Sequence, residues 1–187
     1  MGTVTRRQLT NVLAALSIVL ILAGLAFGLP ALNRALPADR SIAADRPFRI
    51  GAGVSVRPPP GAVLDVTGTR PGATDATALF RIGPVQYAIS VRPYDGTLTS
   101  AAARLRQRIT DTSGYQVTGA QLAVATASGL AGLQGGYAAP GRGGRYAVFL
   151  AEGRTIEVTV SGADLDLGNT LPAIEASTRT LRYERGR

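Results

Sequence analysis

The side chains best suited to chemistry in this sequence are two carboxylates, Asp164 and Asp166, which follow a predicted strand that itself carries Glu157. Two carboxylates can work as general acid and general base when a cleft keeps one of them protonated. This pattern makes a carboxylate-dependent hydrolase one candidate function. Acidic residues are also common where a helix begins, because they interact favourably with the helix dipole. We favour this second interpretation of the Asp-Leu-Asp stretch.

The residue types that are missing exclude most other active sites. The 187-residue chain has no histidine and no cysteine, and all 20 of its basic residues are arginine. The usual zinc, haem and blue-copper sites are therefore excluded, as are Ser-His-Asp and Cys-His catalysis. Without lysine there is no Schiff base and no phosphate-loop lysine. Carboxylates, tyrosine and an oxygen-ligand metal site remain. We expect no metal, no cofactor and no catalytic residues, and predict that the protein is not an enzyme.

Three arginines at alternate positions, Arg104, Arg106 and Arg108, form a candidate anion-contact site. The chain has a formal net charge of +8, and a basic domain near a membrane is attracted to anionic lipids or polymers. The same arginines also fit the solvated face of an amphipathic helix, which we favour. The other arginines are scattered, and the aromatic residues do not line up for base stacking, so we expect no nucleic-acid partner.

Residues 9–33 carry no charged side chain, and Arg6 and Arg7 stand just before the uncharged stretch. Its densest part, 12–29, has Ser17 as its one polar side chain. As a helix this part would rise roughly 27 Å, close to the thickness of the hydrocarbon core of a bilayer. We predict a transmembrane signal-anchor helix at 9–33, which makes the lipid bilayer an expected partner.

Other interpretations of this segment stay open. A cleaved signal peptide would have small residues at its cleavage site, such as Ala26 and Gly28 or Ile42 and Ala44. Neither pair is a clean site, and the apolar run is longer than usual for a signal peptide. A buried helix of a soluble protein seldom has so few polar residues. The sequence in front of the run also resembles a twin-arginine export motif.

The apolar segment divides the chain into four parts. We expect a short cytoplasmic tail at 1–8, the membrane helix at 9–33, a linker at 34–47 and one extracytoplasmic α+β domain at 48–187. The Pro, Ala, Asp and Arg composition of the third part is typical of a linker. Arginines flank the helix on both sides, so a charge count does not fix its orientation. The short, purely basic tail favours a single pass through the plasma membrane with the N-terminus inside.

Alternating apolar residues predict short strands in the first half of the domain. These strands span 48–50, 54–56, 63–66, 78–82 and 85–93. A proline-rich turn at 58–61 ends the second strand, and Gly83-Pro84 predicts a hairpin between the last two. An apolar residue at every third or fourth position then predicts an amphipathic helix from Leu98 to Asp111.

Strands also dominate the second half, where we expect them at 122–126, 130–137, 146–151, 155–161 and 181–183. No helix follows the glycine-rich stretch 140–144, which favours a hairpin loop over a phosphate-binding loop. A second amphipathic helix is predicted from Thr170 to Arg179, with Pro172 in its first turn and a favourable pair between Glu175 and Arg179. The predicted fold class is α+β: an N-terminal transmembrane helix, then one antiparallel-sheet domain with two amphipathic helices.

The order of these elements, together with several local phrases, resembles the PsbP-like α/β/α sandwich, a group that includes the LpqN-type exported proteins of actinobacteria. The phrases are Gly53–Val56 before a proline-glycine turn, Tyr87–Val91 before the first helix, Gly132 in a central strand, Thr155–Ser161, and Ile174–Leu181. The chain lacks the tryptophan often seen after the first turn in this group, and it lacks a lipobox. The resemblance implies an accessory or binding module and gives no catalytic residues to carry over.

Three functions are open from the sequence. The leading one is a membrane-anchored, non-enzymatic module of the cell envelope that binds an envelope protein or an anionic polymer. It rests on the predicted anchor and on the missing catalytic side chains. The second is a structural subunit of a membrane protein complex, which the anchor and the linker fit equally well. The third is the carboxylate-dependent hydrolase with Asp164 and Asp166 as its candidate pair.

Overall fold

The computed structural model describes residues 39–185, so the predicted tail at 1–8 and the predicted membrane helix at 9–33 lie outside the described residues. Among the described residues, no helix combines the length and the apolar character needed to cross a membrane. The described part contains antiparallel strands and two helices, which confirms the α+β class predicted for the domain.

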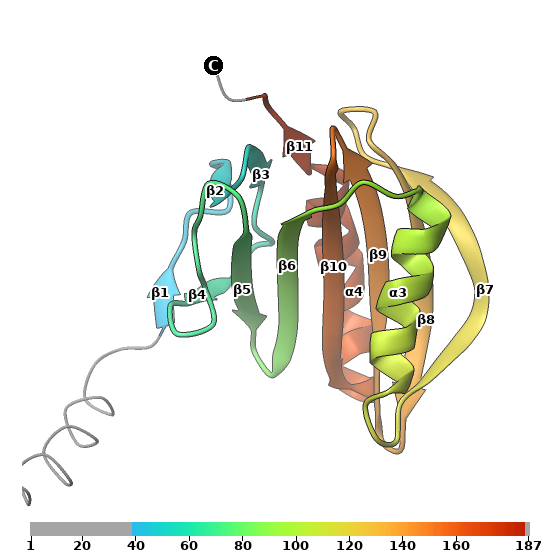
Figure 1. Ribbon diagram of the computed structural model, residues 1–187. Coiled ribbons are helices and arrows are strands. Elements are labelled where there is room, and N and C mark those ends of the chain that lie inside the picture. The colour runs from blue at the N-terminus through green and yellow to red at the C-terminus, as the bar shows by residue number, and fades with distance from the viewer. Residues whose placement is uncertain (1–38, 186–187) are drawn as a thin grey trace, which may run out of the picture. The chain divides into compact units, whose positions relative to one another are not determined.

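One eight-stranded antiparallel sheet forms the centre of the domain (Figure 1). Its strands lie in the order β1-β4-β5-β6-β10-β9-β8-β7. Their bounds are β1 Asp39–Ser41, β4 Val63–Asp65, β5 Ala76–Ile82, β6 Val85–Pro93, β7 Gln116–Ala125, β8 Ala131–Ala139, β9 Arg142–Ala151 and β10 Arg154–Ala163. A smaller sheet has the order β11-β3-β2, with β2 Phe48–Gly51, β3 Val54–Val56 and β11 Arg182–Tyr183.

Two helices cover opposite faces of the larger sheet (Figure 1). Helix α3, Leu98–Thr110, packs on β7, β8 and β9 from one side. Helix α4, Asp164–Arg179, packs on β6, β9 and β10 from the other side. The domain therefore has the helix–sheet–helix layering that the sequence resemblance implied.

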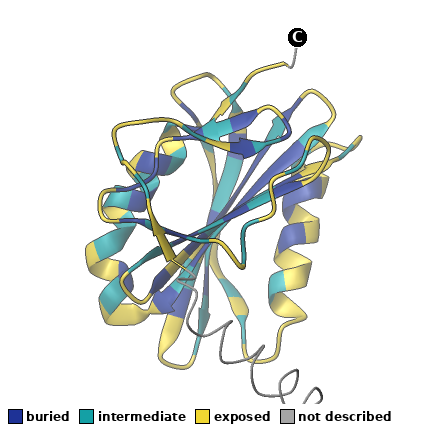
Figure 2. Cartoon of the chain, turned by 90° about the vertical axis from the view of Figure 1, so that its left-hand side faces the viewer, coloured by how far each residue is buried: buried dark blue, intermediate teal, exposed yellow. Residues whose placement is uncertain are grey.

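Alternation along the central strands gives each helix its own core. In β9, every second residue from Ala147 to Ala151 joins the cluster under α4, and Tyr146 and Val148 between them join the cluster under α3. Every second residue of β10 from Ile156 to Val160 also joins the α4 cluster. Figure 2 shows the buried residues concentrated in the sheet and on the inward sides of the helices. The α4 side holds Ala147, Phe149, Ile156, Val158, Val160 and Ile174, and the α3 side holds Ala101, Ala102, Leu105, Tyr137, Tyr146 and Val148.

Hydroxyl groups fasten the C-terminal end of α4 to both sheets. The Tyr87 hydroxyl on β6 lies 3.1 Å from Thr178 Oγ1 in a hydrogen bond. Ser177 Oγ donates to the carbonyl of Arg57 at 2.5 Å, and the backbone N–H of Arg57 donates to Thr180 Oγ1 at 2.8 Å. Since Arg57 follows β3 of the smaller sheet, these bonds fix where α4 lies over the larger one.

Helix α4 begins six residues earlier than predicted, at Asp164 instead of Thr170. Asp164 and Asp166 occupy its first turn, where carboxylates interact favourably with the helix dipole. Pro172 consequently lies inside the helix and not in its first turn. The acidic pair marks the start of this helix, and the proline does not.

The glycine-rich stretch 140–144 is mostly strand, so the predicted loop is wrong beyond Pro140 and Gly141. Gly144 lies in β9 where the sheet is tightly packed. A Cβ at this position would lie 2.0 Å from the carbonyl oxygen of Val160 and 2.3 Å from the Tyr137 ring. This glycine is needed because a ring and a neighbouring strand leave no room for a side chain.

Two further strands differ most from the expectations. Strand β7 begins at Gln116 and not at Leu122, because a register shift between Thr118 and Leu122 interrupts the alternation that would reveal it. Residues 39–41, inside the stretch expected to be a linker, form β1 and pair with β4.

Two glycine substitutions, one in β9 and a control in α4, should change the stability in opposite directions. We expect Gly144→Ala to lower the free energy of unfolding by about 1–3 kcal/mol, since the new methyl group overpacks the site. Gly168→Ala, in α4, should raise it by about 0.5–1 kcal/mol, because open space surrounds this helical glycine. Urea unfolding of the full chain in detergent, followed by circular dichroism, measures both. A neutral Gly144→Ala variant would contradict the packing described for β9.

The buried tyrosines should make stability depend on pH at the alkaline end. Burial raises the pKa of Tyr87 to about 12, and burial together with the neighbouring Tyr115 raises the pKa of Tyr137 to about 12. Both folded-state pKa values exceed the ordinary tyrosine pKa of 10.0, so the stabilisation is complete below pH 10 and is lost as the pH rises toward 12. Urea unfolding between pH 9 and pH 12 checks this. The Tyr87→Phe and Tyr137→Phe variants should each show a smaller alkaline decline than the wild type.

Candidate functional site

The structure does not bring the three candidate carboxylates together. Glu157 lies in β10 on the face covered by α3, and its carboxylate accepts a hydrogen bond from Arg108 Nη2 at 2.5 Å. Asp164 and Asp166 lie in the first turn of α4, which covers the other face. Within residues 39–185 no cluster of three acidic, His or Cys side chains is arranged to hold a metal ion. Glu157 therefore acts as the buried partner of an ion pair, away from the acidic pair.

The three arginines of α3 have different surroundings. The Arg104 guanidinium lies 5.2 Å from the centre of the Tyr94 ring, a cation–π distance. Arg108 is engaged by Glu157, and the Arg106 side chain is exposed. Two of the three thus have contacts within the domain. A contact between this group and an external anion stays a prediction.

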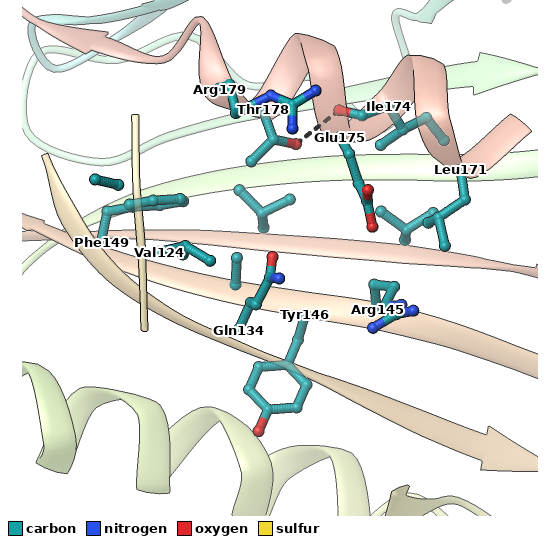
Figure 3. Close-up of a pocket in the computed structure, with 14 residues that line it drawn as sticks. Val124, Gln134, Arg145, Tyr146, Phe149, Leu171, Ile174, Glu175, Thr178 and Arg179 are labelled. Atoms are coloured by element: carbon teal, nitrogen blue, oxygen red, sulfur yellow. Dashed lines mark hydrogen bonds between the residues drawn. The ribbon is translucent and has the colours of Figure 1, made fainter. Parts of the chain in front are cut away.

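A cavity of about 180 Å³ lies on the other face of the sheet, between α4 and the strands β7 to β10 (Figure 3). Its walls are mainly apolar side chains from both layers, which is typical of ligand sites. The sheet contributes Val124, Ala125, Ala147, Phe149, Val158 and Val160, and α4 contributes Leu171 and Ile174.

A glycine makes room for one of the rings that line this cavity. The Phe149 ring lies across Gly132 of the neighbouring strand β8, where a Cβ would come within 2.4 Å of the ring. Tyr146, on the same strand as Phe149, turns its ring away from the cavity, toward α3 (Figure 3). Hydrogen bonds join the β7–β8 turn to the end of α4, next to the lining residues Ala125 and Arg179. Ala127 N–H donates to the Arg179 carbonyl at 2.7 Å, and Ser128 Oγ donates to the Leu181 carbonyl at 2.8 Å.

Charged side chains border the cavity without pairing to one another. Arg145, Glu175 and Arg179 all line it, and within residues 39–185 none of the three takes part in an ion pair. The predicted pair between Glu175 and Arg179 is therefore wrong. The reason is the direction of Glu175, whose carboxylate extends from α4 toward the sheet (Figure 3). Gln134 points to the same space from β8 and adds an amide.

No motif in the sequence predicts this cavity. Its lining comes from four strands and one helix that are far apart in the chain, and each residue reads as ordinary core when taken alone. One signal was nevertheless present. From Thr112 to Gly141 the sequence contains no charged residue, and this stretch covers the whole of β7 and β8. A long uncharged stretch at one end of a sheet indicates a surface that contacts a ligand or a partner as well as solvent.

Solved structures show which fold this arrangement represents. The solution structure of cyanobacterial PsbP (CyanoP) from Synechocystis sp. PCC 6803 matches with a TM-score of 0.56 at 16% sequence identity, over 77% of this chain and 95% of that chain. The domain has a PsbP-like fold. This confirms the fold that the sequence resemblance implied, while identity this low carries no function with it.

Two other solved structures match this chain with lower TM-scores. The Ran-binding protein Mog1p of Saccharomyces cerevisiae has a TM-score of 0.47 and 9% identity, over 70% of this chain and 90% of that chain. LpqN of Mycobacterium tuberculosis, a protein involved in cell envelope biogenesis, has a TM-score of 0.44 and 12% identity, over 73% and 89%. No protein-family model matches the chain, and no curated protein matches it by sequence.

The ion pair on the α3 face can be tested by removing its exposed partner. Arg108→Ala leaves the Glu157 carboxylate, which is 10% exposed, without its partner. We expect a loss of about 1–3 kcal/mol in unfolding free energy, toward the lower end because the arginine side chain is 47% exposed. Arg106→Ala serves as the matched control and should stay within about 0.5 kcal/mol. Equal stability of the two variants in urea unfolding would show that the pair has no structural role.

Proposed function

We propose that this protein is a membrane-anchored, non-enzymatic binding module of the cell envelope, with its domain outside the cytoplasm. The observation that carries the proposal is the cavity between α4 and the sheet. It combines apolar walls with three charged side chains that have no ion-pair partner within residues 39–185. A site of this kind holds an apolar group of a ligand and orients it through charge.

The predicted location rests on the sequence. The uncharged stretch 9–33 supports an anchor in the bilayer, and the basic tail in front of it supports an inward N-terminus. The arginine-only composition is typical of a GC-rich genome, and with the resemblance to LpqN-type proteins it supports an actinobacterial source. The proposed partner is an envelope protein or an anionic envelope polymer, in keeping with the positive charge of the chain.

A binding role agrees better with the described residues than the hydrolase does. A carboxylate-dependent mechanism needs two acids in one cleft. Here Glu157 is paired on one face of the sheet, whereas Asp164 and Asp166 begin a helix on the other. Neither aspartate lines the cavity. We therefore do not assign a catalytic role to these residues.

Surface proteolysis of intact cells tests the location. With a C-terminal tag on the full chain, we expect external protease to remove the tag while the N-terminal part stays in the membrane fraction. A tagged cytoplasmic protein in the same cells must keep its tag. Protection of the tag until lysis would place the domain in the cytoplasm and contradict the proposal.

Crosslinking in the same cells, followed by purification in mild detergent, tests the binding role. We expect an envelope protein or polymer to be recovered with the wild type. Recovery should fall by about tenfold with the Arg145→Glu/Arg179→Glu variant and stay unchanged with Arg106→Glu. A partner recovered in fixed stoichiometry that is insensitive to the cavity variant would instead favour the structural subunit of a membrane complex.

A further inference from the structure

We propose that the free edge of β7, together with the cavity beside it, binds an extended segment of a partner protein. The segment adds to the sheet as a strand next to β7 and places one large apolar side chain in the cavity, with acidic residues on either side. This inference rests on the proposed function, because it names the site and the class of partner for the same binding module.

The two edges of the eight-stranded sheet are protected very differently. At one edge β1 has 3 residues, and its Asp39 forms an ion pair with Arg81. Short length and charge are common means of preventing an edge from pairing with another strand. At the other edge β7 has 10 residues and contains neither a charged residue nor a proline. The register shift between Thr118 and Leu122 is the one irregularity that interrupts it.

Strand β7 is the outermost strand of the sheet, and no described segment lies beyond it (Figure 1). Its peptide groups on that side are therefore open to an incoming strand. The strand also exposes apolar surface, because the Leu122 side chain is 54% exposed. Leu122 pairs with Gln134 and lies two residues before Val124, and both of these residues line the cavity. The open edge and the cavity thus form one continuous surface.

An added strand would present its side chains to the cavity in the right order. Neighbouring strands lie about 4.8 Å apart, and alternate side chains of a strand point to the same face. Every second side chain of the partner would lie on the α4 face beside Leu122 and Val124. An apolar cavity of about 150 Å³ is large enough to hold a benzene molecule. The cavity here is slightly larger, at about 180 Å³, and has room for one leucine or aromatic side chain.

The charges around the cavity decide between a partner protein and a second copy of this chain. Arg145 and Arg179 contribute two positive charges, and Glu175 contributes one negative charge. A second β7 strand would bring no acidic residue to these arginines, since β7 is uncharged. A segment with acidic residues beside its apolar anchor complements the site. The observations therefore favour strand addition by an acidic partner over self-pairing.

The test uses two fluorescent ten-residue peptides with a central leucine and, two positions before and after it so that all three side chains share one strand face, aspartates in one peptide and lysines in the other. Each is titrated with the full chain in detergent micelles, and binding is followed by fluorescence anisotropy. We expect the aspartate peptide to bind at least about tenfold more tightly than the lysine peptide. Hydrogen exchange of the complex should show new protection of the backbone amides at 116–125.

Substitutions on the chain assign the site. Leu122→Lys places a charge at the open edge and should weaken binding of the aspartate peptide by at least about tenfold. Val66→Lys is the matched control, because Val66 is 44% exposed and follows β4, far from β7 in strand order. It should leave binding unchanged. Arg145→Glu should reduce the preference for the aspartate peptide. Unchanged circular dichroism spectra show that the variants remain folded.

Three results would overturn the inference. They are the failure of both peptides to bind, protection confined to α4 without β7, and protection of β7 that rises with protein concentration when no peptide is present. The third would assign the edge to a second copy of this chain. A different outcome separates this inference from the proposed function. If the peptide binds but the C-terminal tag is protected in the surface proteolysis experiment, the proposed envelope location is wrong and the strand-addition site stands.

Discussion

The fold depends on covering both faces of its central strands. Successive residues of β9 are buried alternately under α3 and α4, so each face requires a cover of its own. A helix is roughly 10 Å wide, whereas neighbouring strands lie about 4.8 Å apart, so one helix reaches about three strands, as α3 and α4 each do. Two helices therefore cannot cover eight strands. On the β5 side the smaller sheet completes the cover. There the centres of the Phe48 and Phe80 rings lie 5.4 Å apart. On the β7 side of the α4 face no described segment does so, and the cavity lies there.

The sequence predicts those elements whose pattern follows directly from burial. Val85–Pro93 alternates because one face of β6 is fully buried, and the structure has this strand with the predicted bounds. The helix starting at Leu98 was predicted for the same reason. The pattern fails where a residue serves a purpose other than burial. Gly144 belongs to a glycine-rich stretch that is typical of a turn, but it lies in a strand, where the missing side chain leaves room for the Tyr137 ring. In β7 the register shift interrupts the alternation of apolar residues.

The candidate site was less predictable than the fold, because it depends on distant parts of the chain. Phe149 and Ile174 each read as core, and only the packing of α4 on β9 shows that a space remains between the two layers. The partner of Arg108 is another example. Glu157 is 49 positions away and looked like a catalytic candidate until its ion pair was located. Periodicity assigns a residue to a face of an element, but it does not say what lies opposite.

The uncharged stretch from Thr112 to Gly141 needs an explanation beyond burial. A buried hairpin would lack charges for a simple reason, but most residues of β7 are exposed. Surfaces of soluble domains usually carry charges, and exposed edge strands carry them in particular, because charge prevents unwanted pairing. An exposed edge strand without charge is prone to aggregation, so a strand of this kind is expected to have a function that offsets this risk. The adjoining cavity provides one, because its Arg145 and Arg179, which form no ion pair within residues 39–185, distinguish an acidic partner strand from a second copy of the chain.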